Sequence, residues 1–476
     1  MLRLAAFVIA LTLAVSSLAV PSLAVPLAAT ATAAPYDEGL STPKEDSYYP
    51  EKGDPGIDTL HYDLDLTWLK KARELRGMAK IAFRATSTSS RFQLDLAHPM
   101  DVRRVTVDGS EADFSHPGKT LFVRTSVEAE SRHTVRVVYR GTPRPASGPA
   151  SRSDIARVGM RVTKDGQLWT MQEPFGAFTW YPANDQPSDK ALYDVKVDVP
   201  SPWVGVSNGQ MLDRRTVGGR TVTEWTNAHP MSSYLMTIGV GPYKHYRQSG
   251  PHGLPMNYWV PRNRPELVKP LLRTPAALRW LERRLGPYPF DRVGVMVTPS
   301  GSAMETQTLI TFGVKNYVYG ARGVRQTIVH ELAHQWYGDT VTPNDWRDLW
   351  MNEGMATYQD TRWAAAQGWT TWQSWQHQWA QDDQLWRDIY GPPGDYKPNQ
   401  FASLNVYYCT ALMWDRLRLK IGTATFNRLV RSWPQAAAHR DSNQPRSTII
   451  AWFEARSGRE LSLFFNRWLN SAKSPA

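Results

Sequence analysis

The chain has 476 residues, of which 42% are hydrophobic and 21% are charged, and it contains 20 Trp and 20 Tyr. This length gives room for two or three domains with buried cores, and the aromatic content excludes global disorder. The formal net charge of +11 is scattered along the chain and gives no support to nucleic-acid binding. The single cysteine, Cys409, excludes an intramolecular disulfide and is typical of a small buried side chain.

The first 33 residues have the features of a secretory signal peptide. Arg3 gives a positive start, residues 4–20 form an uncharged apolar run, and Ala-Thr-Ala at 31–33 supplies small residues that signal peptidase accepts. An uncleaved membrane anchor is the alternative, and Pro21 and Pro26 argue against it because they interrupt a longer span. We therefore expect cleavage after position 33 and a secreted, extracellular protein without a stable membrane partner.

The next part of the chain has the pattern of β-structure. Residues 34–58 are rich in Pro, Gly and charge, which predicts an extended lead-in. Residues 59–244 are then predicted to form a β-rich N-terminal domain. Apolar and polar residues alternate with a period of two at 62–66, 92–96, 135–137 and 193–199, with turn signals such as Asn208-Gly209 and Gly218-Gly219 between such runs.

After Gly241 and Pro242 the period becomes that of helices, and residues 245–476 are predicted to form a second, mostly helical domain. Pro275 is typical of a first helical turn, so a regular helix is expected from there to Leu285. Further helices are expected at 323–337, 353–367, 410–419 and 447–456, and a short strand at 293–297.

The strongest indication of chemistry is the H-E-L-A-H run at 330–334. On a helix, His330 and His334 lie one turn apart on the same face and can bind one metal ion. Glu331 is rotated by about 100° from His330, which places it beside the metal, where a base for metal-bound water is needed. The alternative is a pair of histidines packed in a helical core. The helix itself is supported by an apolar stripe of Val324, Ile328, Leu332 and Trp336.

Zinc needs a third protein ligand, and Glu353 follows His334 by nineteen positions. The intervening segment contains Gly338 and Pro343 and predicts a loop, so a helix that starts near Glu353 can return antiparallel and present its carboxylate. Two histidines and one glutamate leave a fourth position for water, which is typical of a catalytic zinc site with one ion per chain. Asp360, seven residues further on, either accepts a hydrogen bond from a ligand histidine or is a solvated helix residue.

The segment 330–358, HELAHQWYGDTVTPNDWRDLWMNEGMATY, resembles the aminopeptidase N-like zinc metallopeptidases, a family that includes the leukotriene-epoxide hydrolases. The resemblance extends more weakly over most of the chain after the first 33 residues. It implies an N-terminal all-β, saddle-like domain followed by a thermolysin-like α/β, mostly helical, catalytic domain. Only about 66 residues follow Thr410, so the large helical C-terminal domain of many relatives is not expected, and the cleft should be more open. Besides the metal ligands, the agreement includes Trp336, Gly338, Trp346, Leu349, Trp350, Asn352, Gly354 and Tyr358.

Three shorter segments match substrate-binding motifs of the same family. S-A-M-E-T at 302–306 resembles its G-A-M-E-N strand, which implies that Glu305 binds the free amine of the substrate and that Ala303 and Met304 line the site. T-M-Q-E-P at 170–174 resembles a T-Q-x-E-P segment and implies that Glu173 is the second amine-binding carboxylate. N-V-Y-Y-C-T-A at 405–411 resembles V-Y-E-K-G-A and implies that Tyr407 stabilises the transition state.

Together these residues predict a zinc-dependent aminopeptidase that removes the first residue from peptides with a free N-terminus. Glu331 is then the catalytic base, and the substrate ammonium relieves the repulsion between the two amine-binding carboxylates. The alternatives are a zinc endopeptidase with an open cleft, an epoxide hydrolase, and an inactive binding protein on a peptidase scaffold. No feature of the sequence indicates an oligomeric state.

Overall fold

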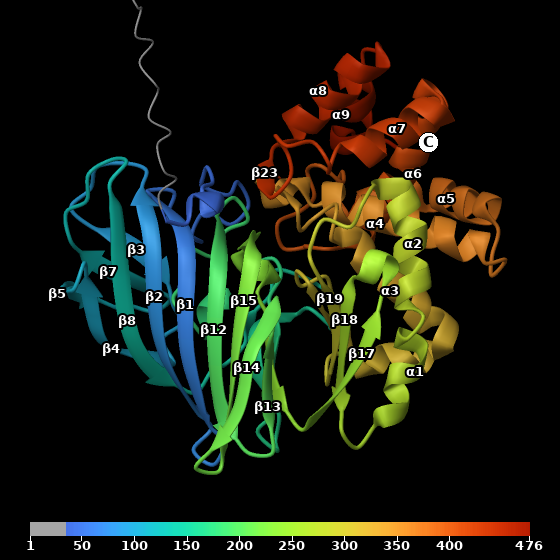
Figure 1. The fold of residues 1–476 in the computed structure, drawn as a ribbon. Coiled ribbons are helices and arrows are strands. Elements are labelled where there is room, and N and C mark those ends of the chain that lie inside the picture. The colour runs from blue at the N-terminus through green and yellow to red at the C-terminus, as the bar shows by residue number, and fades with distance from the viewer. Residues whose placement is uncertain (1–34) are drawn as a thin grey trace, which may run out of the picture. The chain divides into compact units, whose positions relative to one another are not determined.

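The computed structural model describes residues 35–476, and the expected signal peptide lies outside them. The first half is built on an eight-stranded sheet in the order β14-β15-β12-β1-β2-β8-β4-β5 (Figure 1). Neighbouring strands are antiparallel except for β1 and β12, which run parallel. The strands are β1 (Ile57–Leu69), β2 (Glu74–Ala85), β4 (Met100–Val107), β5 (Ser110–Glu111), β8 (Arg132–Gly141), β12 (Lys190–Pro200), β14 (Gln210–Val217) and β15 (Arg220–Ser232).

Two smaller sheets complete this half, one of five strands in the order β13-β16-β11-β10-β9 and one of three in the order β3-β7-β6. The predicted alternation is confirmed in β1, where Tyr62, Leu64 and Leu66 are at most 1% exposed and point into the core. The strands are β3 (Phe92–Asp95), β6 (Asp113–Ser115), β7 (Thr120–Arg124), β9 (Ala146–Ser147), β10 (Arg157–Val162), β11 (Leu168–Met171), β13 (Val204–Ser207) and β16 (Ile238–Gly241).

The lead-in before β1 is not simply extended. It contains a 3-10 turn, η1 (Asp37–Gly39), and then runs against the second half of the chain. Lys44 Nζ lies 2.8 Å from Asp345 Oδ2, and Asp46 Oδ2 accepts a hydrogen bond of 2.7 Å from the Trp346 backbone N–H. The lead-in therefore joins the two halves.

The second half contains a five-stranded sheet in the order β17-β18-β19-β21-β20, of which only β19 was expected from the pattern. The prediction that helices dominate residues 245–476 is confirmed, but the other four strands of this sheet were not expected from the pattern. The fully buried run of β21 has no period of two, so alternation does not reveal it. The strands are β17 (Tyr243–Ser249), β18 (Pro255–Pro261), β19 (Val293–Thr298), β20 (Ala303–Met304) and β21 (Leu309–Gly313), with a separate pair β22 (Val341–Pro343) and β23 (Ser442–Gln444).

Helices pack beside this sheet and above it in the view of Figure 1. The long helix α5 and the short helices α7 and α9 were not predicted. The helices are α1 (Val268–Leu271), α2 (Thr274–Leu285), α3 (Gly320–His334), α4 (Trp350–Ala366), α5 (Trp372–Tyr390), α6 (Thr410–Ile421), α7 (Thr423–Ser432), α8 (Arg446–Ser457) and α9 (Ser462–Asn470), with a π-helical turn, η8 (Asn405–Cys409), before α6.

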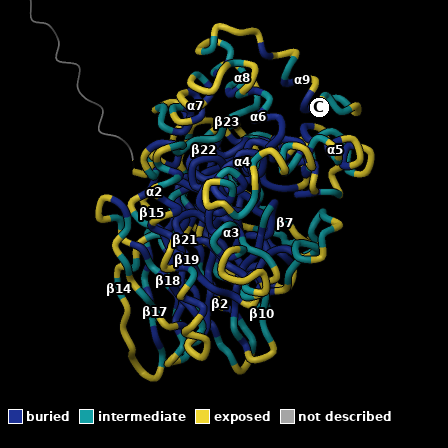
Figure 2. The backbone as a smooth tube through the Cα atoms, turned by 90° about the vertical axis from the view of Figure 1, so that its right-hand side faces the viewer, coloured by how far each residue is buried: buried dark blue, intermediate teal, exposed yellow. Residues whose placement is uncertain are grey.

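The expected bounds of the two site helices are corrected by a few residues. Helix α3 ends at His334 and not at 337, because the N–H groups of Gln335 and Trp336 bond to carbonyls three residues back and tighten the chain into a turn. Helix α4 begins at Trp350, one turn earlier than expected. It runs through the buried centre of the molecule (Figure 2).

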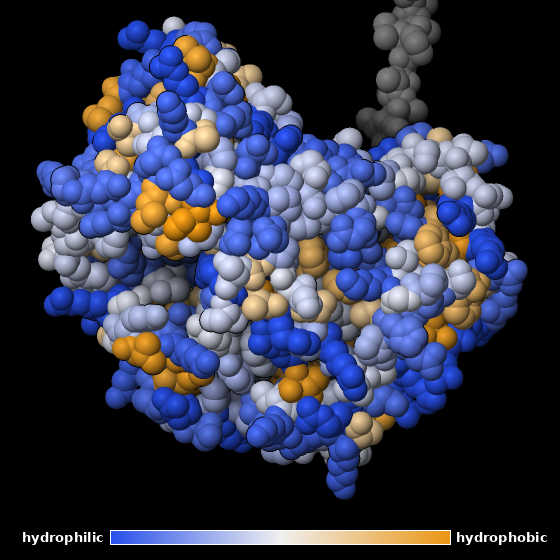
Figure 3. Space-filling view, turned by 180° about the vertical axis from the view of Figure 1, so that it is seen from behind, coloured by the Kyte–Doolittle hydropathy of each residue, from blue (hydrophilic) through white to orange (hydrophobic). Residues whose placement is uncertain are grey.

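The surface of the described part shows no dominant apolar face in the view of Figure 3, where apolar side chains lie in separate patches among polar ones. The most exposed large apolar residues are Val318 and Tyr319, just before α3, at 77% and 72%. Within residues 35–476, none of the helices has the length and apolar character needed to cross a membrane.

Candidate active site

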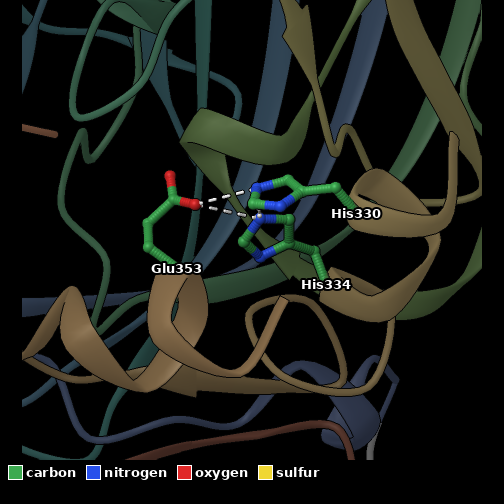
Figure 4. Close-up of side chains that lie close together, drawn as sticks. All are labelled: His330, His334 and Glu353. Carbon is green, nitrogen blue, oxygen red and sulfur yellow. Dashed lines mark hydrogen bonds and ion pairs between the residues drawn. The ribbon is translucent and has the colours of Figure 1, made fainter. Parts of the chain in front are cut away.

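The three expected metal ligands lie together between two packed helices. His330 and His334 project from α3 toward Glu353 at the start of α4 (Figure 4). Glu353 Oε2 lies 3.1 Å from His330 Nε2 and 3.3 Å from His334 Nε2, and the two Nε2 atoms are 3.2 Å apart. One ligand atom from each residue therefore faces a common point, with all three within 4.8 Å of one another.

The other ring nitrogen of each histidine already has a partner. His330 Nδ1 is 2.8 Å from Asp360 Oδ2, and His334 Nδ1 is 3.2 Å from the Tyr337 carbonyl oxygen. Because these partners only accept, each Nδ1 is a donor and each Nε2 is the nitrogen left to bind a metal ion. A cation at the point that both Nε2 atoms and the carboxylate face would displace a proton held there, and two imidazoles with one carboxylate are the donor set of catalytic zinc. These residues thus fit a zinc ion.

The pKa shifts of the ligands reflect their mutual attraction. Burial opposes ionisation of all three, but Glu353 and Asp360 hold the pKa of His330 above its ordinary value. The two histidines in turn lower the pKa of Glu353, so its carboxylate is ionised at neutral pH.

Glu331 lies one residue after the first ligand and is itself buried, with 6% of its surface exposed. It lines a cavity of about 110 Å³ together with the three metal ligands. Burial raises the pKa of Glu331 to about 8, against the lowering effect of the two histidines. A carboxylate with a raised pKa beside a metal position is suited to take up a proton from water and to release it again.

Glu173 and Glu305 lie on the same cavity from two different parts of the fold. Glu173 follows β11 in the β-rich half, and Glu305 follows the edge strand β20, whose Ala303 and Met304 also line the cavity. In each carboxylate the Oε1 atom is buried and has no hydrogen-bond partner. Burial is the largest cause that raises the pKa of both residues, and the neighbouring carboxylates add to it. A cation between them would remove this penalty.

Tyr407, and not its neighbour Tyr408, faces the same cavity. It lies in the π-helical turn η8, and its ring is 6.0 Å from the ring of His330. Tyr408 instead packs between Trp379 and Trp386, with ring centroids 6.1 and 5.1 Å away. The turn therefore separates two adjacent tyrosines, so that one faces the site and the other, partly buried, packs against the helical core.

The approach of α4 to this turn depends on a glycine. A Cβ atom on Gly354 would lie 2.2 Å from Thr410 Oγ1, closer than any side-chain contact allows. Gly354 thus lets the start of α4, which carries Glu353, lie directly against the segment that carries Tyr407.

The sequence did not indicate several residues of the cavity. Arg152 comes from the loop before β10, and it reaches the site from the β-rich half of the chain. No motif marks it among 55 basic residues. The other unexpected lining residues are Ile155, Met171, Ser302 and Ala402.

A strand-rich domain followed by a mostly helical domain with this ligand set defines the class as zinc metallopeptidases. The model of the peptidase family M1 domain matches residues 271–468, and that of the peptidase M1 N-terminal domain matches residues 58–235. The chain belongs to peptidase family M1.

Among characterised relatives, aminopeptidase N of Streptomyces lividans is 26% identical over 453 residues, which are 87% of this chain and 50% of the relative. Leucyl aminopeptidase of Saccharolobus solfataricus is 25% identical over 332 residues, or 67% of this chain and 40% of the relative. The chain thus spans half or less of the length of these curated relatives.

Solved structures match over nearly their whole length. An M1 zinc metallopeptidase from Deinococcus radiodurans has 26% sequence identity and a TM-score of 0.80, with 92% of this chain and 98% of that one covered. A variant of a Deinococcus radiodurans M1 zinc metallopeptidase bound to the substrate Tyr-Ser-Ala gives a TM-score of 0.79 at 26% identity, with 92% and 99% covered.

Proposed function

We propose that the protein is a zinc-dependent aminopeptidase that hydrolyses the first peptide bond of peptides with a free N-terminus. The observation that carries this proposal is the pair Glu173 and Glu305. Each has a buried, unpartnered carboxylate oxygen on the cavity that holds the metal ligands. The α-ammonium of a peptide supplies the missing cation, and its position would bring only the first peptide bond to the metal.

When bound, zinc polarises water and the scissile carbonyl group and lowers the pKa of the water. Glu331 accepts a proton from the attacking water and later gives it to the leaving amine. The hydroxyl of Tyr407 donates a hydrogen bond to the carbonyl oxygen as negative charge develops there. Glu173 and Glu305 hold the ammonium, while Asp360 keeps the His330 ring in the orientation that binds metal.

The relatives support this activity. A structure of a two-domain M1 zinc metallopeptidase variant bound to L-tryptophan has a TM-score of 0.81 to this chain at 26% identity. The Streptomyces lividans and Saccharolobus solfataricus relatives are both named aminopeptidases. Peptides are therefore the substrate class that we propose for this chain.

The proposal is tested with matched peptides that carry either a free or an acetylated N-terminus. Each well-placed carboxylate contributes about 1.5–3 kcal/mol to ammonium binding, so acetylation should lower kcat/KM by at least ~10²-fold. Glu305→Gln should reduce this preference, because it impairs cleavage of free-amine peptides far more than that of blocked ones.

Glu266→Gln is the control, since Glu266 is an exposed glutamate of the same half that pairs with Arg264 on the surface. It should leave the preference unchanged. Equal cleavage of both peptides, with internal bonds cut, would contradict the proposal and indicate an endopeptidase with the same zinc site.

We further propose that the protein is exported. The positive start, apolar run and small residues of positions 1–33 support this proposal. N-terminal sequencing of the protein from culture medium should give a chain that starts at Ala34, and retention of the full chain in the cell would contradict it.

A further inference from the structure

Arg152 contacts the proposed transition-state tyrosine directly. Its Nη1 donates hydrogen bonds to the Tyr407 hydroxyl oxygen at 2.9 Å and to the Ala402 carbonyl oxygen at 3.0 Å. The guanidinium carbon also lies 5.6 Å from the centre of the Tyr407 ring. The arginine comes from the β-rich half and the tyrosine from the helical half, so this contact joins the two halves at the active site.

The guanidinium is held firmly in this position. Asp154 accepts from Nε at 3.3 Å and from Nη2 at 2.7 Å, which makes a bidentate pair. With the two bonds from Nη1, Arg152 uses four of its five N–H donors on the protein itself. A guanidinium that binds a substrate carboxylate needs two free donors on one edge. Arg152 has one free donor and is therefore built to hold a protein group.

We propose that Arg152 is a positioning residue that orients the hydroxyl of Tyr407 for catalysis, an inference that rests on the proposed function. A phenol oxygen that accepts from Arg152 directs its own O–H away from the guanidinium and toward the side chain of Glu353 beside the metal position, where the carbonyl oxygen of a bound peptide would lie. The adjacent positive charge also polarises the phenol and makes its O–H a stronger donor. Arg152 thus acts on the reaction through Tyr407 and not on the substrate.

A double-mutant cycle tests this role. Arg152→Met should lower kcat by about tenfold with little change in KM, since the tyrosine acts on the transition state. In the Tyr407→Phe background the same change should lower kcat less than about twofold, because no hydroxyl is left to orient. Asp154→Asn should give a smaller decrease that also disappears in that background.

Arg161→Met is the matched control. Arg161 lies on β10 in the same half, is partly buried and stacks on Trp169 away from the cavity, so its loss should leave kcat and KM unchanged. Zinc content and the unfolding midpoint are measured for every variant. If Arg152→Met does not fold, Arg152→Lys keeps the charge but not the four bonds, and it should show the same dependence on Tyr407 with a smaller decrease.

Crystal structures of the wild-type and Arg152→Met proteins give a readout that does not depend on activity. We expect the Tyr407 hydroxyl to move or to lose its single position when Arg152 is removed. An equal loss of kcat in both backgrounds, a change confined to KM, or an unmoved tyrosine would overturn the inference. Equal cleavage of free and acetylated peptides would instead overturn the proposed function. The double-mutant cycle would still test the role of Arg152, because it can be measured with whichever peptide is cleaved.

Discussion

The metal site and the cavity around it are built in opposite ways. All three metal ligands lie between residues 330 and 353, on two helices that pack against each other. The walls of the cavity come from segments far apart in the chain, with Arg152 and Glu173 from the β-rich half and Tyr407 from the turn before α6. The set of metal ligands is therefore a local property of the fold, whereas the make-up of the cavity walls, and with it the proposed substrate recognition, depends on how the two halves meet.

Loss of a ligand should have the largest effect, because it removes the local part of the site. Glu353→Ala should abolish stoichiometric zinc binding and hydrolysis together, and chelation of the wild-type protein should do the same reversibly. Asp360→Ala removes only the partner of His330 and should weaken zinc affinity by about 10–100-fold.

Zinc titrations of the wild-type, Asp360→Ala and Glu353→Ala proteins, read by metal analysis after dialysis, check that zinc affinity decreases in this order. If Glu353→Ala and Asp360→Ala bind zinc equally well, or if hydrolysis is indifferent to chelators, the metal site has been assigned to the wrong residues.

The same contrast explains how far the sequence alone could lead. The spacing of His330 and His334 was readable because helical geometry fixes which residues share a face, whatever the rest of the fold does. Glu353 was readable because a short loop with Gly338 and Pro343 allows the next helix to return antiparallel. Tyr407 and Glu173 were found only through resemblance to a family, since no local period selects one tyrosine or glutamate among many. Arg152 was missed because its role arises from a contact with a residue 255 positions away in the chain.

The fold shows the same limit. Alternation predicted the half-buried strands of the first half, but it did not reveal β21, whose residues are all buried. The bounds of α3 and α4 were wrong by about one turn, because no side-chain cap marks the ends of these helices and the backbone turns that end α3 leave no trace in the hydrophobic period.

The next largest effect should come from the base. Glu331→Gln keeps the shape of the side chain and removes its basicity, so turnover should fall by ~10²–10⁴-fold while one zinc per chain is retained. This outcome would separate proton transfer from metal binding within the same helical segment. Parallel measurements of kcat and zinc content on the wild-type and Glu331→Gln proteins check this prediction. Gln326→Glu is not a suitable control, because Gln326 donates a hydrogen bond to Asp360. Loss of zinc from Glu331→Gln would contradict the assignment of Glu331 as the base and place it among the ligands.

The smallest effect should come from the junction of the two halves, where Asp345 accepts from Lys44 Nζ at 2.8 Å and from Ser47 Oγ at 2.7 Å. Asp345→Asn should lower the free energy of unfolding by about 1 kcal/mol at pH 7. This value is at the low end of the contribution of a charge-assisted hydrogen bond, because the Lys44 side chain is 41% exposed and solvent screens the pair. Zinc content should not change, since the metal site is local to α3 and α4.

The pH dependence of this loss gives a sharper test. Burial opposes ionisation of Asp345, but the bonds from Lys44 and Ser47 outweigh it and hold the pKa below its ordinary value. A depressed carboxylate pKa adds stability above the unfolded value of about 3.9, and this stability is lost as the pH falls through the folded pKa. The difference in unfolding midpoint between wild type and Asp345→Asn should therefore be full at pH 7 and vanish at strongly acidic pH. Asp113→Asn, at an exposed position on β6, should show no difference at either pH. A deficit for Asp345→Asn that stays constant with pH would mean that its carboxylate charge does not hold the two halves together.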